Sequence, residues 1–104
     1  MDLKKTDPEF SEIFERFVNE EVGKEQGQTL DDTTRYLVVL ATLIGCQGIQ
    51  AYGEYLEEVL DKGMDPIMIK ECVYQAVDYL GYGRMLPFLT TTNQIFQQKI
   101  FLYH

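Results

Sequence analysis

Histidine is nearly absent from this chain of 104 residues: it occurs once, as His104, at the final position, where chains usually fray. A zinc site built on histidine, a Ser-His-Asp triad and a Cys-His pair all need a positioned imidazole. We therefore expect none of these sites. The acidic cluster from Glu54 to Asp61 also lacks the Glu-x-x-His partner of a di-iron bundle, so we expect no metal.

Cysteines and long apolar stretches are scarce as well. The two cysteines, Cys46 and Cys72, are too few for a disulfide-rich scaffold. The first eight residues are polar and predict no secretory leader, and the longest apolar stretch, residues 36–44, is too short to cross a bilayer as a helix. Together these features predict a soluble cytoplasmic protein.

Basic side chains are outnumbered: 9 lysines and arginines face 17 acidic residues, which gives a net charge of −8. Nucleic-acid binding needs a basic footprint, and an anionic membrane surface would repel this chain. We expect neither partner. The apolar fraction of 45% and the charged fraction of 25% are those of an ordinary globular protein, and the length predicts one domain over residues 1–104.

Apolar residues recur at intervals of three and four, which predicts an all-α domain of about five helices without strands. The pairs Asp7-Pro8 and Asp65-Pro66 each resemble a helix start, with an aspartate cap followed by proline at the first helical position. The expected helices cover about residues 8–18, 31–44, 49–61, 66–80 and 88–103. A polar loop is expected at residues 23–28, and a turn at residues 81–83.

The segment of residues 36–44 is apolar on every side and is compatible with a buried strand or a helix. We favour a helix because the pattern extends back to residue 33 and no other strand is available to pair with it. Such a helix needs cover on most of its sides. A domain of this size supplies too little cover, so we expect a homo-oligomer.

An ordered series of short motifs resembles a known family. Leu30-Asp-Asp-Thr-Thr-Arg35 precedes the apolar helix, a glycine-containing break follows, and the next helix ends in Asp61-Lys-Gly-Met64. After Asp65-Pro66 comes the segment from Ile69 to Tyr82, with Glu71, Gln75 and an aromatic-Gly-aromatic tail. This order and spacing resemble the carboxymuconolactone decarboxylase family, with its AhpD-like fold, over residues 30–96, about two-thirds of the chain.

The resemblance implies a compact helical subunit that assembles into trimers or hexamers, with a small-molecule pocket beside the subunit contacts. It implies either decarboxylation of a carboxylated muconolactone or peroxide reduction by a Cys-x-x-Cys-x-x-x-His motif with an upstream glutamate. The family's histidine falls on Tyr55, its cysteines on Gly48 and Ala51, and its glutamate on Tyr36. Cys46 therefore has no resolving partner, and we expect no thiol peroxidase.

Decarboxylation leaves an electron pair that must be delocalised and then protonated, which calls for a cation or donor near the carbonyl and a proton donor near carbon. We predict Tyr55 and Tyr36 as catalytic residues. The predicted substrate-binding residues are Tyr52, Arg35, Arg84 and Cys46. The predicted function is cofactor-free decarboxylation of a carboxylated lactone or related acid. The alternative is a catalytically silent ligand-binding or structural homo-oligomer of the same family.

Each candidate residue also has an ordinary structural role available to it. The three tyrosines fit as core or interface aromatics, and Arg35 fits as the partner of Asp31 or Asp32. Cys46 is either a reactive thiol at a helix N-terminus or a small buried side chain. The enzyme hypothesis requires the tyrosine hydroxyls to converge on one cavity that solvent can reach.

Overall fold

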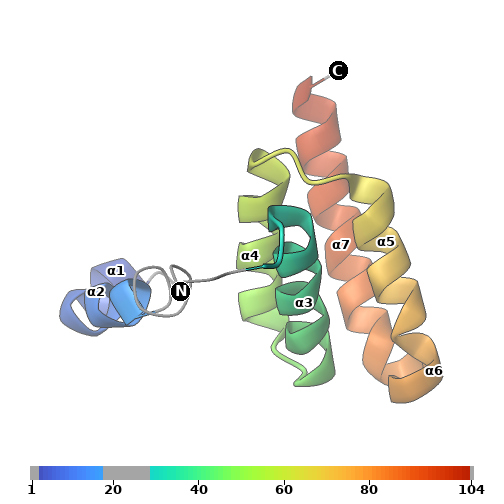
Figure 1. Cartoon of the computed structure of the whole chain (residues 1–104), viewed down its shortest axis with the longest axis horizontal. Coiled ribbons are helices and arrows are strands. Elements are labelled where there is room, and N and C mark those ends of the chain that lie inside the picture. The colour runs from blue at the N-terminus through green and yellow to red at the C-terminus, as the bar shows by residue number, and fades with distance from the viewer. Residues whose placement is uncertain (1–2, 18–28, 104) are drawn as a thin grey trace. The chain divides into compact units, whose positions relative to one another are not determined.

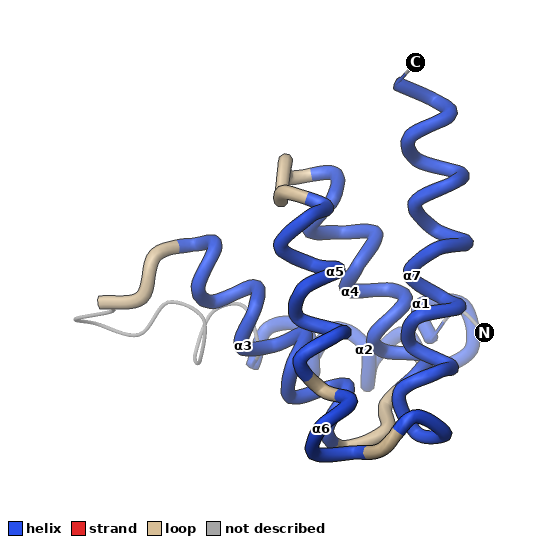
Figure 2. The backbone as a smooth tube through the Cα atoms, turned by 90° about the vertical axis from the view of Figure 1, so that its right-hand side faces the viewer, coloured by secondary structure: helices blue, strands red, loops and turns tan. Residues whose placement is uncertain are grey.

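Helices account for nearly all of the described chain, which comprises residues 3–17 and 29–103 of the computed structural model (Figures 1 and 2). No strand occurs in these two ranges, so the all-α prediction is confirmed. The helices are α1 (Leu3–Thr6), α2 (Pro8–Arg16), α3 (Asp32–Gly45), α4 (Ile49–Asp61), α5 (Pro66–Gln75), α6 (Val77–Leu80) and α7 (Tyr82–Tyr103). The apolar stretch of residues 36–44 is helical, as favoured over a strand.

The contacts cluster the chain into two compact units, Met1–Asp31 and Asp32–His104. The single domain over residues 1–104 stays a prediction. Helices α1 and α2 belong to the first unit, and α3 to α7 belong to the second. The expected loop at residues 23–28, and His104, lie outside the described residues.

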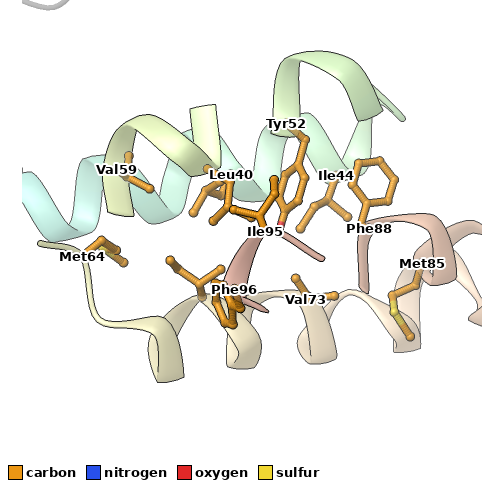
Figure 3. Packing of buried hydrophobic residues seen from close by; sticks show 12 residues of the cluster. Leu40, Ile44, Tyr52, Val59, Met64, Val73, Met85, Phe88, Ile95 and Phe96 are labelled. Carbon is orange, nitrogen blue, oxygen red and sulfur yellow. The ribbon is translucent and has the colours of Figure 1, made fainter. Parts of the chain in front are cut away.

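The second unit is a helical bundle in which α3 packs against α4 and α5, while α7 packs against α4, α5 and α6 (Figure 1). Its core lies between these helices (Figure 3). The buried apolar side chains are Leu40, Ile44, Tyr52, Leu56, Val59, Met64, Ile69, Val73, Met85, Phe88, Ile95 and Phe96. Within residues 3–17 and 29–103, no helix combines the length and apolar character needed to cross a membrane.

The end of the predicted fourth helix differs from expectation. It is interrupted at Ala76 and continues as the short helix α6. Gly81, with φ of +85°, ends α6 in a left-handed conformation that glycine adopts without steric cost. That one residue reverses the chain, so Tyr82 and Gly83 already belong to α7 instead of the expected turn.

The two Asp-Pro pairs, although alike in sequence, cap their helices differently. Asp65 has an extended backbone, and its Oδ1 accepts a hydrogen bond from the backbone N–H of Ile67 at 2.9 Å. Asp7 makes no such cap, and its Oδ2 accepts a hydrogen bond from the neighbouring Thr6 hydroxyl at 2.9 Å. The predicted side-chain cap is therefore confirmed at Asp65 and wrong at Asp7.

Replacing Asp65 by alanine should lower the free energy of unfolding by about 1 kcal/mol, the usual contribution of a side-chain N-cap. Asp7→Ala is the matched control and should change it by less than about 0.5 kcal/mol. Urea denaturation followed by circular dichroism measures both values. Equal effects of the two substitutions would contradict the assignment of the cap.

Candidate functional site

The two residues predicted to be catalytic lie together, on neighbouring helices. Tyr36 of α3 and Tyr55 of α4 are both half-buried, and their rings meet edge to face with centroids 6.5 Å apart. This contact follows from the packing of α3 against α4, which brings positions distant in the sequence to one surface. The pair therefore presents two phenols on one side of the bundle.

Two cations flank this tyrosine pair. The Nζ of Lys62 lies 5.8 Å from the ring centroid of Tyr36 and donates a hydrogen bond to Glu58 Oε1 at 3.1 Å. The Nη1 of Arg35 donates to Asp32 Oδ1 at 2.9 Å, so a pairing with Asp32, one of the two acids considered from the sequence, is present. Both acids are more than half exposed, and exposed ion pairs of this kind contribute only about 0–1 kcal/mol.

The surroundings of Tyr55 keep its phenol protonated. Burial raises the pKa of Tyr55 above its ordinary value, the charges of Glu58 and Tyr36 act in the same direction, and Arg35 opposes them. At neutral pH this side chain is therefore a hydrogen-bond donor or a proton donor, not a base.

Tyr52 belongs to the core and not to this surface. Its side chain is fully buried, and its ring meets that of Phe88 edge to face at 5.2 Å (Figure 3). Its hydroxyl lies 2.6 Å from Thr92 Oγ1, which in turn donates to the carbonyl of Phe88 at 2.6 Å. Because the Thr92 proton is used in that bond, Tyr52 is the donor to Thr92. The structure thus separates Tyr52 from Tyr36 and Tyr55.

Cys46 and Arg84 are not brought to the tyrosine pair either. Cys46 follows α3 in a turn, where its thiol is exposed and donates to the Leu43 carbonyl with an S···O distance of 3.7 Å. The buried alternative considered for Cys46 is therefore wrong. Arg84 is exposed in the first turn of α7.

A second feature, an apolar groove, runs between α3 on one side and α5 and α6 on the other. Its volume is about 640 Å³, which is within the range of small-molecule sites. It is lined by Thr34, Leu37, Val38, Ala41, Ile44, Gly45, Met68, Glu71, Cys72, Gln75, Ala76, Tyr79 and Leu80. None of the six predicted site residues is among them.

The chemistry of the groove differs from that of the tyrosine pair. Glu71 is its single charged side chain, so a carboxylate bound there would meet no cation. Cys72 is half-buried, and burial raises the pKa of its thiol, which therefore stays protonated at neutral pH. One sign of this surface is present in the sequence, because residues 34, 37, 38, 41, 44 and 45 form one stripe at helical spacing.

Among the described residues, no group of three or more histidine, cysteine, aspartate or glutamate side chains is placed to hold a metal ion. Comparisons with protein-family models, with curated proteins and with solved structures find no match for this chain.

Proposed function

We propose that this chain binds a small carboxylate-bearing molecule at the surface formed by Arg35, Tyr36, Tyr55 and Lys62, the tyrosine site, and decarboxylates it without a cofactor. This is the activity of the family that residues 30–96 resemble. The observation that supports it is the edge-to-face contact of Tyr36 and Tyr55, with Lys62 over the Tyr36 ring and the Arg35 charge acting on Tyr55. Phenols and cations are the groups that recognise a carboxylate and stabilise developing negative charge.

Each of the two cations has an exposed acidic partner. Arg35 and Lys62 are paired with exposed acids, and water competes strongly for such pairs. A ligand carboxylate that accepts two parallel hydrogen bonds from Arg35 would bind it more strongly than the exposed carboxylate of Asp32 does. The tyrosine site therefore favours an anionic molecule, although the chain as a whole carries a net charge of −8.

The proposed reaction needs one proton donor. The bond between the ligand and its carboxylate carbon breaks, carbon dioxide leaves, and the electron pair stays on the ligand, where it delocalises into a carbonyl. Tyr55 then gives its proton to the carbon, and water reprotonates the phenolate. Tyr36 orients the ligand by hydrogen bonding. Burial, by raising the pKa of Tyr55, ensures that the proton is present at neutral pH.

A second candidate is a catalytically silent, ligand-binding or structural homo-oligomer. The burial of Tyr52 favours it, because the enzyme hypothesis asked three tyrosine hydroxyls to share a cavity and this one is closed within the core. The two candidates differ in whether carbon dioxide leaves the bound molecule.

The test is release of carbon dioxide from a carboxylated muconolactone by the full chain. Tyr55→Phe should lower kcat/KM at least about 100-fold, because it removes the proton donor and general acid catalysis contributes roughly 10²–10⁴-fold. Tyr74→Phe is the matched control, since Tyr74 lies on α5 outside the tyrosine site, and should leave kcat/KM unchanged.

Calorimetric titration with the same lactone separates the two candidates. Binding that Arg35→Gln weakens, without release of carbon dioxide, would establish the silent alternative. Activity that Tyr55→Phe leaves intact would remove Tyr55 from the mechanism, and a lactone that neither binds nor reacts would refute the proposed substrate class.

A further inference from the structure

The apolar groove between α3 and α5–α6 has a single charged side chain in its lining, and no cation balances that charge. The groove has a volume of about 640 Å³, and Glu71 of α5 is the one charged residue that lines it. Within residues 3–17 and 29–103, no basic side chain forms a salt bridge with Glu71. The groove therefore offers an unbalanced negative charge to a molecule that binds there.

Two further polar groups of the groove suit a cationic ligand. Gln75 lies one helical turn after Glu71 on α5, and both side chains line the groove. Their oxygen atoms are hydrogen-bond acceptors, and an ammonium group has three N–H donors. Tyr79 of α6 lines the same groove and is 90% exposed, and the face of an aromatic ring attracts a cation. The α5–α6 side of the groove is therefore suited to an ammonium group.

The opposite wall of the groove is apolar. The residues of α3 that form it recur every three or four positions, and they include Leu37, Val38, Ala41 and Ile44. Val38 is 50% exposed, so part of this apolar surface is in contact with water. An apolar molecule that covers the wall removes this surface from water, which favours binding. The groove thus combines an apolar wall with an anionic one.

Charge distinguishes between the possible ligands. A fatty acid would bring a second carboxylate to Glu71, and a neutral lipid would leave its charge unbalanced. An alkylamine is protonated at neutral pH, as the lysine side chain is, and the net charge of −8 attracts cations to this chain. The tyrosine site does not compete for such a ligand, because its side chains Arg35 and Lys62 repel a cation.

We propose that the groove binds a primary amine with an apolar body, which donates hydrogen bonds from its ammonium group to Glu71 and Gln75 and lies with its body against α3. The inference is independent of the proposed decarboxylation, because no residue of the tyrosine site lines the groove. Each methylene group added to the body should strengthen binding by up to about fourfold, the usual effect of burying one such group.

The test compares octylamine, octanol and octanoate, which share one apolar body and differ in the charge of the head group. Calorimetric titration of the full chain at pH 7 should show that octylamine binds about tenfold more tightly than octanol, the usual effect of a hydrogen bond to a charged group. Octanoate should bind most weakly of the three, since like charges repel. Equal Kd values for octylamine and octanol would overturn the proposal, because the groove would then recognise only the apolar body.

Glu71→Gln keeps the size of the side chain and removes its charge. Because Glu71 is exposed, the substitution should leave the fold intact. We expect it to weaken octylamine binding about tenfold and to leave octanol binding unchanged. Glu57→Gln is the matched control, since it removes an exposed carboxylate of α4 outside the groove, and it should change neither affinity. Equal losses in the two variants would show that the net charge of the chain, and not Glu71, attracts the amine.

The two cysteines locate the bound amine within the same protein. Cys72 lines the groove, whereas Cys46 is exposed and lies outside the groove lining. Octylamine should slow the alkylation of Cys72 by iodoacetamide in proportion to the fraction of chain bound, and should leave the alkylation of Cys46 unchanged. Mass spectrometry of the digested chain measures both rates. An unaltered rate at Cys72 with octylamine bound would place the amine outside the groove and overturn the proposal.

Discussion

Replacement of Phe88 by alanine is expected to lower the free energy of unfolding by about 3–5 kcal/mol, the usual cost of emptying a buried phenylalanine position. Phe88 is 1% exposed and lies in the core between α4 and α7. Its ring meets the ring of Tyr52 at 5.2 Å, so the substitution removes an aromatic contact and leaves a cavity beside a second large side chain (Figure 3). The total free energy of unfolding of a small domain is about 5–15 kcal/mol, so the Phe88→Ala substitution would remove a large part of it.

Phe14→Ala is the matched control for this prediction, since the same group is removed from a side chain that is 56% exposed on α2. We expect it to change the free energy of unfolding by less than about 1 kcal/mol. Urea denaturation followed by circular dichroism gives both values. Similar losses in the two variants would show that Phe88 does not occupy the core position described here.

An increase in pH from 10 to 12 is expected to destabilise the bundle by about 2 kcal/mol through Tyr52 alone. Burial raises the pKa of Tyr52 from its ordinary value of 10.0 to about 12, against the effect of its hydrogen bond with Thr92. Below pH 10 the Tyr52 hydroxyl keeps its proton in both the folded and the unfolded chain, so Tyr52 contributes no pH dependence to the free energy of unfolding. Above pH 10 the unfolded chain releases the proton while the folded chain retains it, so unfolding becomes progressively easier.

Tyr52→Phe isolates this effect, because the other ionisable groups are the same in both proteins. Near pH 7 the wild type should be more stable by about 1 kcal/mol, the contribution of its hydrogen bond. At pH 12 the order should be reversed, with the variant more stable by about 1–2 kcal/mol. Curves of unfolding free energy against pH that stay parallel would show that Tyr52 ionises as easily in the folded chain as in the unfolded one.

Local chemistry predicted the helices well and their interruptions poorly. The apolar stretch of residues 36–44 is a helix, as expected for a segment with no strand to pair with. The interruption at Ala76 was not predicted, because no glycine or proline stands between residues 67 and 80. Helix α6 packs against α7. The local sequence of residues 66–80 carries no information about this contact with a later helix. The sequence has glycines at positions 81 and 83, and it did not indicate that Gly81 alone adopts the left-handed conformation of the turn.

The positions of the candidate site residues were also only partly predictable from the sequence. The sequence placed Tyr52 and Tyr55 on one side of a helix because they are three residues apart. Three residues at 3.6 per turn still leave about 60° between two side chains, enough to direct them to different neighbours. Tyr55 meets Tyr36 of α3, whereas Tyr52 meets Phe88 and Thr92 of α7. The packing of the whole bundle decides which helix lies against each face of α4. The groove between α3, α5 and α6 was not predicted for the same reason.

The hydrogen bonds that run from Tyr52 through Thr92 to the Phe88 carbonyl fix the register of α7 against α4. Apolar packing alone distinguishes weakly between helices that slide past each other by one turn of 5.4 Å. Such a slide would leave the buried Tyr52 donor without an acceptor, at a cost of about 1–3 kcal/mol. Two hydroxyl groups in an otherwise apolar core therefore select one alignment of the helices among several that would bury a similar area.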